Sequence, residues 1–113
     1  MNIQIFGKNK CFDTKKAQRW FKERGIKFQM IDMKEKGLSK GELNSVIQAV
    51  GGLEELLDEK TKDQKAYLLI KYLAPEDKFE KVLENPMVLK QPIVRNGRQA
   101  TVGYQPDVWK NWE

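Results

Sequence analysis

The chain has 113 residues and a formal net charge of +5, with 40% hydrophobic and 33% charged residues. This length suits one domain with a modest core, and the composition is typical of a soluble globular protein rather than of a disordered or membrane-spanning chain. The single cysteine and the lack of histidine exclude an internal disulfide framework and remove the usual zinc sites and Ser-His-Asp triads, so no metal site is expected. The N-terminus lacks a signal-peptide pattern, and we therefore expect a cytoplasmic monomer without membrane contacts.

The charge is unevenly distributed. Residues 1–40 carry eleven Lys/Arg and four Asp/Glu, whereas residues 41–86 carry six and ten. Only four of the 21 cations are Arg, and aromatic residues do not interleave with them, so direct nucleic-acid binding is not indicated. An anionic small molecule or an acidic protein partner fits the basic end, and a solvated lysine-rich surface explains it without any ligand.

The first third of the chain predicts a strand, a helix and a second strand. Residues 2–6 alternate weakly between apolar and polar types. Ala17, Trp20 and Phe21 lie at helical spacing and predict a helix from residue 13 or 14 to residue 24, ended by Gly25. Residues 26–32 alternate and predict the second strand. This order indicates a parallel pair joined by a crossover helix.

The middle of the chain predicts several helices. Ser39-Lys40-Gly41-Glu42 matches the capping-box pattern, and it is followed by an apolar stripe that ends at Gly51-Gly52. The stripe is Leu43, Val46, Ile47 and Val50. A further helix is predicted over residues 63–73 from Ala66, Leu69, Ile70 and Leu73. Another begins at Pro75 and ends before Pro86.

The C-terminal part predicts a hairpin and a last helix. Residues 93–95 and 98–102 flank Asn96-Gly97, a strong hairpin signal. Gln105-Pro106 opens a helix with Val108, Trp109 and Trp112 on one side. The order β-α-β, a helical insertion at about 37–86, and then β-β-α is that of a single α/β thioredoxin-like domain over residues 1–113, with a central mixed sheet.

Cys11 is the candidate for chemistry because it directly precedes the first helix. The positive end of the helix dipole favours a thiolate there. Four flanking lysines act in the same direction: Lys8, Lys10, Lys15 and Lys16. Asp13 opposes them, and a lone cysteine also fits a small buried hydrophobe. Both a reactive and a structural Cys11 are therefore open.

Two further residues have a structural and a functional interpretation. Pro92 stands just before the third strand, where a thioredoxin-like sheet holds a cis proline facing the thiol. A proline that begins a strand is also explained by the absence of a ladder donor. Thr14 and Asp13 are good helix N-cap types, and we expect capping rather than catalysis to explain Thr14.

Several motifs are similar to those of one family. They are Ile5-Phe6-Gly7-Lys8-Asn9-Lys10-Cys11, Lys16-Ala17-Gln18-Arg19-Trp20-Phe21, Gly37-Leu38-Ser39, residues 84–94 and Val102-Gly103-Tyr104. The chain resembles the arsenate reductase (ArsC)/Spx family of thioredoxin-like proteins. The resemblance implies that Cys11 is a thiolate nucleophile. It also implies substrate contacts from Lys10, Thr14, Lys15, Gln91 and Pro92.

The chain departs from the family at functional positions. Dithiol members have a second cysteine where this chain has Thr14, so a monothiol member with an external thiol such as glutathione as co-substrate, and no bound cofactor, is implied. Family arsenate reductases hold the oxyanion with arginines, and the matching positions here are Asp58, Gln91 and Gln105. Neither Asp nor Gln supplies bidentate guanidinium contacts, which argues against efficient arsenate reduction.

Three functions fit these observations. The favoured one is a glutathione-dependent thiol-disulfide reductase that uses Cys11. The alternatives are an Spx-like regulator that binds RNA polymerase and a catalytically inactive binding module.

Overall fold

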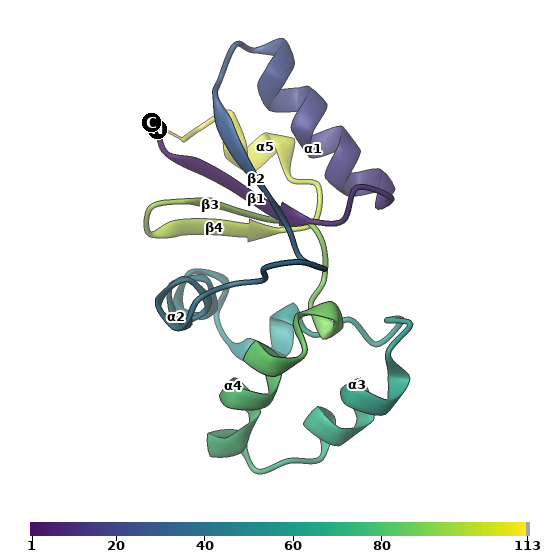
Figure 1. The fold of residues 1–113 in the computed structure, drawn as a ribbon. Coiled ribbons are helices and arrows are strands. Elements are labelled where there is room, and N and C mark those ends of the chain that lie inside the picture. Colours follow the sequence, from purple (N-terminus) through teal and green to yellow (C-terminus); the bar gives the residue numbers. More distant parts are fainter. Residues whose placement is uncertain (113) are drawn as a thin grey trace.

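The computed structural model describes residues 1–112, and its centre is a four-stranded sheet. The strands are β1 (Ile3–Gly7), β2 (Phe28–Asp32), β3 (Ile93–Asn96) and β4 (Gln99–Val102), in the order β2-β1-β3-β4 (Figure 1). β2 runs parallel to β1, β3 runs antiparallel to β1, and β4 runs antiparallel to β3. The predicted mixed sheet and parallel first pair are confirmed.

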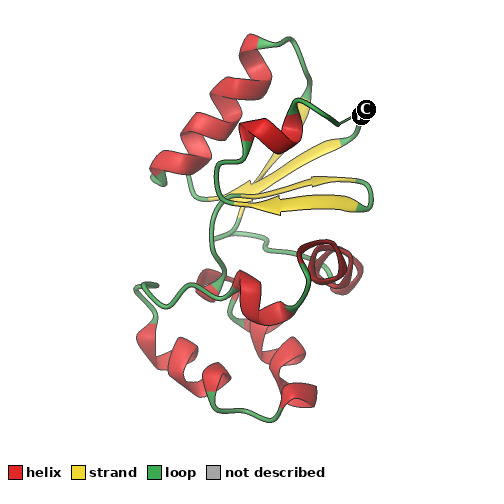
Figure 2. Cartoon of the chain, turned by 180° about the vertical axis from the view of Figure 1, so that it is seen from behind, coloured by secondary structure: helices red, strands yellow, loops and turns green. Residues whose placement is uncertain are grey.

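Helices cover both faces of the sheet. α1 (Phe12–Glu23) and α5 (Pro106–Trp109) lie on one face, and α2 (Lys40–Val50) lies on the other (Figure 2). Four further elements extend the molecule beyond α2 to 42 Å along its long axis. They are the 3-10 turns η1 (Leu53–Leu56) and η2 (Pro86–Val88), with α3 (Gln64–Lys71) and α4 (Pro75–Glu84) between them. From here on, the insertion means η1, α3, α4, η2 and their connecting loops. It does not include α2, which the predicted helical insertion at about 37–86 did.

The core is divided by the sheet into two apolar clusters. Successive strand residues point to opposite faces, so Ile5 packs under α1 and α5 while Phe6 packs toward α2 and the insertion. On the first face, Trp109 is 2% exposed and lies against Trp20 and Phe21. The C-terminal end of β1 lies between the α1 layer and the insertion (Figure 1).

Two local predictions about the strands differ from the structure. β2 begins at Phe28 rather than at residue 26, because the Ile26 N–H donates back to the Phe21 carbonyl at 3.0 Å and closes the helix end. Asn96 pairs with Gln99, so the two-residue hairpin loop is residues 97–98 rather than 96–97. Its first residue has φ of +62°, as in a type II′ turn, where glycine is favoured.

The last helix also differs in one detail. Trp109 and Trp112 are buried as expected, but Val108 is 41% exposed. α5 is only four residues long, so its short apolar face accommodates two tryptophans and leaves Val108 outside. Within residues 1–112, every helix is too short or too polar to span a bilayer.

The predicted capping box at α2 is confirmed. The Ser39 hydroxyl accepts from the Glu42 N–H at 3.2 Å, and the Glu42 carboxylate accepts from the Ser39 N–H at 2.8 Å. The carboxylate also accepts from the Gln4 side chain at 3.2 Å. Burial alone raises the pKa of Glu42, but these hydrogen bonds and the positive charge of Arg95 outweigh it and hold the pKa below its ordinary value.

The lowered pKa predicts an acid-sensitive contribution of Glu42 to stability. A carboxylate with a depressed folded-state pKa stabilises the fold above its unfolded-state pKa, and this contribution is lost as the pH falls through the folded-state value. At neutral pH, Glu42→Gln should therefore lower the free energy of unfolding by about 0.5–1 kcal/mol. Urea unfolding at neutral pH and at about pH 3 tests this, since the difference should nearly vanish in acid. A difference of the same size at both pH values would contradict it.

Candidate functional site

The structure places Cys11 at the N-cap of α1. β1 ends at Gly7, and the Cys11 N–H donates to the Lys8 carbonyl at 3.1 Å, which turns the chain into the helix. Cys11 has extended backbone angles, and its carbonyl accepts from the Lys15 N–H at 3.1 Å. The side chain is partly exposed. The thiol thus lies at a helix start, where free N–H groups favour an anion.

The prediction that Asp13 or Thr14 caps this helix is wrong. The extended residue that begins α1 is Cys11, so both residues lie within the first turn. Thr14 is 0% exposed, and its hydroxyl has no hydrogen-bond partner within residues 1–112. It faces Gly7 at the end of β1. Thr14 is therefore a packing residue in this structure, and a substrate contact would require it to become accessible.

The close approach of Thr14 predicts a strong effect of Gly7→Ala. A Cβ at residue 7 would meet the Thr14 hydroxyl and would lie 2.8 Å from its Cγ2. Because that side chain is fully buried, overpacking should cost about 1–3 kcal/mol. Adding Thr14→Ala removes both atoms and should restore most of the loss. Urea unfolding of the two single variants and the double variant measures this coupling, and simple additivity would contradict it.

Cys11 opens into a cavity of about 290 Å³, which we call the cysteine cavity. Four lysines line it: Lys8, Lys10, Lys60 and Lys62. Asp58 is its one carboxylate, and Gln91, Thr61 and Met87 complete it. Four ammonium groups against one carboxylate give the lining a net positive charge, which favours an anionic ligand over a cationic one.

Long-range contacts bring the loop of residues 58–62 to the cysteine. Leu57 forms an isolated antiparallel bridge with Leu89, just before β3. The Thr61 hydroxyl donates to the Met87 carbonyl at 2.8 Å, and Thr61 is 8% exposed. The loop is therefore fixed against the segment that leads into β3, and its two lysines line the same cavity as Cys11.

Pro92 and Gln91 lie where the pattern placed them. The Gln91–Pro92 peptide bond is cis, and the Pro92 carbonyl accepts from the Gly103 N–H at 2.8 Å. Gln91 lines the cysteine cavity, and its side-chain oxygen is buried without a partner within residues 1–112. Pro92 itself is buried and does not line the cavity.

The other candidate residues do not all lie at the cysteine cavity. Lys10 and Asp58 line it. A larger cavity lies beside it, and Lys15 is exposed and lines neither of the two. Gln105 lies in the larger cavity, where its side chain donates to the Val102 carbonyl at 3.2 Å.

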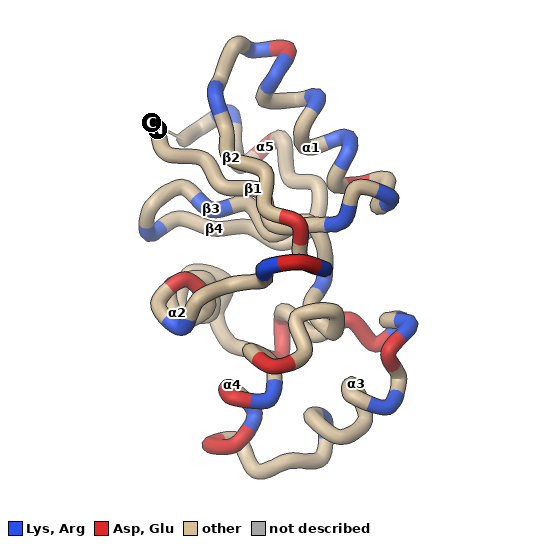
Figure 3. The backbone as a smooth tube through the Cα atoms, in the orientation of Figure 1, with Lys and Arg blue, Asp and Glu red and all other residues tan. Residues whose placement is uncertain are grey.

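Sequence reasoning did not identify the lysines of the 58–62 loop as site residues. The only signal was the resemblance that aligned Asp58 with a functional position. Figure 3 shows Lys and Arg following one another along α1 and the loop before it. After α2, it shows acidic residues in the loop that leads to α3 and along α4.

The mixed sheet, the helix-start cysteine and the cis proline before β3 define a thioredoxin-like protein. The family model described as the ArsC family matches residues 6–112. The chain belongs to the ArsC family.

The proteins and solved structures to which this chain is similar have names that indicate different functions. The chain is 30% identical over 109 residues to the global transcriptional regulator Spx 2 of Oceanobacillus iheyensis, covering 95% of this chain and 80% of that protein. An arsenate reductase from Vibrio cholerae superposes with a TM-score of 0.80 and 25% identity, covering 96% and 94% of the two chains. The glutaredoxin-like NrdH-redoxin of Escherichia coli has a TM-score of 0.50 and 17% identity, covering 100% and 96% of the two chains, and shows the fold alone.

Proposed function

We propose that this chain is a cytoplasmic monothiol oxidoreductase that exchanges disulfides through Cys11 with glutathione as the second thiol. The observation that carries the proposal is a partly exposed helix-start cysteine in a cavity lined by four lysines. Glutathione carries two carboxylates and one ammonium group, so it is a net anion that suits this charge.

The reaction needs one protein thiol and two glutathione molecules. The Cys11 thiolate attacks the glutathione sulfur of a mixed disulfide, the old S–S bond breaks, and the substrate thiolate leaves and takes a proton. A second glutathione thiolate then attacks the glutathione sulfur held on Cys11. Oxidised glutathione leaves, and Cys11 returns to the thiolate. Thr14 stands three residues after Cys11, so an internal disulfide is not part of this cycle.

The segment before β3 supplies a second element of binding. Within residues 1–112, the Gln91 backbone N–H and carbonyl form no hydrogen bond. Gln91 also lines the cysteine cavity. These free groups can pair with an extended ligand as a strand would.

Arsenate is expected to be a poor substrate. Asp58 and Gln91 lie in the cysteine cavity, at positions where the resemblance implies arginines in arsenate reductases. A carboxylate in the same cavity as the thiol repels an arsenate anion, and lysines do not form the bidentate contacts of guanidinium groups.

The proposal is tested by steady-state reduction of the mixed disulfide between glutathione and 2-mercaptoethanol, with glutathione and glutathione reductase in the assay. We expect turnover that depends on glutathione and a glutathione adduct on Cys11 in the absence of the reductase. A complete lack of turnover and of adduct would contradict the proposal.

A second function is favoured by the outer face of α3. Leu68, Leu69 and Tyr72 are 48%, 50% and 77% exposed, although Leu69 belongs to the apolar spacing that predicts this helix. Together with Lys65 they follow helical spacing on one side of the helix. This surface fits a protein-binding regulator, and RNA polymerase is the partner that the similarity to Spx proteins suggests. Retention of purified polymerase by the immobilised chain, with loss in Leu68→Asp/Tyr72→Asp, would favour this function.

A further inference from the structure

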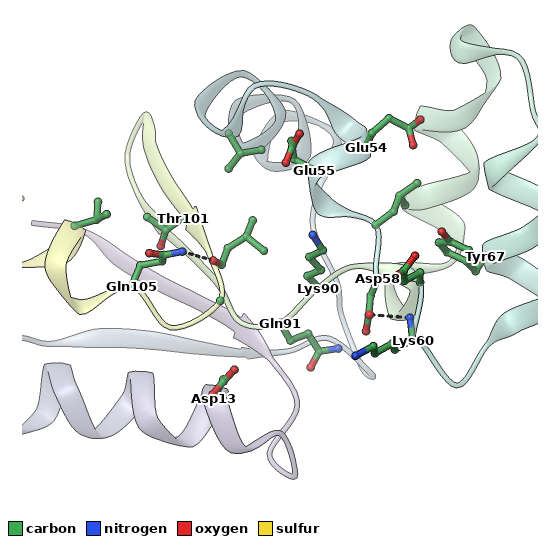
Figure 4. Close-up of a pocket in the computed structure, with 16 residues that line it drawn as sticks. Asp13, Glu54, Glu55, Asp58, Lys60, Tyr67, Lys90, Gln91, Thr101 and Gln105 are labelled. Atoms are coloured by element: carbon green, nitrogen blue, oxygen red, sulfur yellow. Dashed lines mark hydrogen bonds between the residues drawn. The ribbon is translucent and has the colours of Figure 1, made fainter.

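A second, larger cavity adjoins the cysteine cavity and has the opposite charge. It has a volume of about 1000 Å³ and shares Asp58, Lys60 and Gln91 with the cysteine cavity. In Figure 4, Glu55 and Asp58 lie on the side of the insertion, and Gln105 lies on the side of the sheet. We call this cavity the acidic groove.

The groove is negative on a chain that is positive overall. Its carboxylates are Asp13, Glu54, Glu55, Asp58 and Glu59, against Lys60 and Lys90. Glu54 is compensated, because it lies 2.6 Å from the Lys78 ammonium. The other four carboxylates form no ion pair within residues 1–112. Such unpaired carboxylates on the wall of a groove attract a cationic ligand.

The groove also has apolar walls and borders the edge strand of the sheet. Leu57 and Tyr67 lie on the insertion side, and Val108 lies on α5. β4 is the last strand of the sheet, and its residues Thr101 and Val102 line the groove. The aliphatic stems of Lys and Arg side chains bury well against such walls while their charged ends reach carboxylates. These features fit a length of basic polypeptide better than a small cation.

We propose that the acidic groove binds a basic polypeptide segment, and that the substrate of Cys11 is a disulfide between glutathione and a cysteine within such a segment. The glutathione half occupies the lysine-lined cysteine cavity, and the polypeptide half occupies the acidic groove. Cys11 attacks the glutathione sulfur, so the S–S bond breaks and the polypeptide cysteine leaves as a thiolate and takes a proton. The inference rests on the proposed function and adds the class of its substrate.

Two synthetic peptides with the same central glutathionylated cysteine test the inference, one flanked by Lys and Arg and the other by Asp and Glu. At low ionic strength, kcat/KM should be at least about fivefold higher for the basic peptide, and the ratio should fall toward one at about 0.5 M salt. Glu55→Gln/Glu59→Gln should reduce the ratio to near one. Glu23→Gln/Glu76→Gln changes the net charge equally at exposed positions outside the groove and should leave the ratio unchanged.

The outcomes separate the inference from the function on which it rests. If the mixed disulfide of glutathione and 2-mercaptoethanol is turned over but the two peptides react equally, the groove proposal is wrong and the proposed function stands. The same conclusion follows if the Glu55/Glu59 variant keeps the full preference. If no disulfide is turned over, the proposed function fails. Fluorescence anisotropy with cysteine-free versions of both peptides then decides the groove proposal, and equal or absent binding overturns it.

Discussion

Replacing Cys11 by serine is expected to abolish glutathione-dependent disulfide reduction, with a loss of at least about a thousandfold in kcat/KM. A serine hydroxyl is a weak nucleophile unless a base activates it, and this chain contains no histidine. Because Cys11 is the only cysteine, no other thiol can replace it in the reaction. The coupled assay with glutathione reductase measures the loss.

The Cys11 variants should fold as the parent does. Cys11 is partly exposed, and its side chain forms no cap hydrogen bond within residues 1–112. Cys11→Ser and Cys11→Ala should therefore show urea unfolding midpoints close to that of the parent, and both should be inactive. Turnover retained by either variant would show that the chemistry lies elsewhere.

Trp109→Ala is expected to have the largest effect on stability, a loss of about 3–5 kcal/mol. The ring is 2% exposed and lies between Trp20 and Tyr104, with centroid distances of 5.5 Å to each. Its indole N–H donates to the buried Thr101 hydroxyl at 2.8 Å. The substitution removes a large buried ring and leaves a buried hydroxyl unpaired.

Trp109→Phe provides the graded comparison and keeps the prediction testable if Trp109→Ala does not fold. Phe retains a ring against Trp20 but cannot donate to Thr101, so we expect a loss of about 1–3 kcal/mol. Urea unfolding at neutral pH measures both variants. An alanine variant as stable as the phenylalanine variant would show that the ring does not hold α5 against the sheet.

The elements that follow local patterns were predictable from the sequence. Ser39 and Glu42 form the capping box that their spacing indicates, and the alternation of β1 places Ile5 and Phe6 on opposite faces. The predictions were wrong where a residue type that is preferred at one position of an element also fits a neighbouring position. Thr14 has the preference of a cap, but only backbone geometry decides which residue begins a helix, and that residue is Cys11.

The site was only half predictable for a related reason. Cys11 and Gln91 could be identified because each lies at a recognisable point, before a helix and before a proline that begins a strand. Lys60 and Lys62 line the cavity of Cys11 because the Leu57–Leu89 bridge and the Thr61 hydrogen bond fix their loop against the segment before β3. Contacts between segments this far apart in the chain leave no periodic signal.

The central claim is that Cys11 exchanges disulfides in a cavity built for an anion. The most direct test is the second-order rate constant for adduct formation at Cys11 with oxidised glutathione, which is anionic, and with bis(2-hydroxyethyl) disulfide, which is neutral. The account predicts that oxidised glutathione reacts at least about tenfold faster at low ionic strength and loses most of this advantage at about 1 M salt. Equal rates that do not respond to salt, or no adduct with either disulfide, would contradict it.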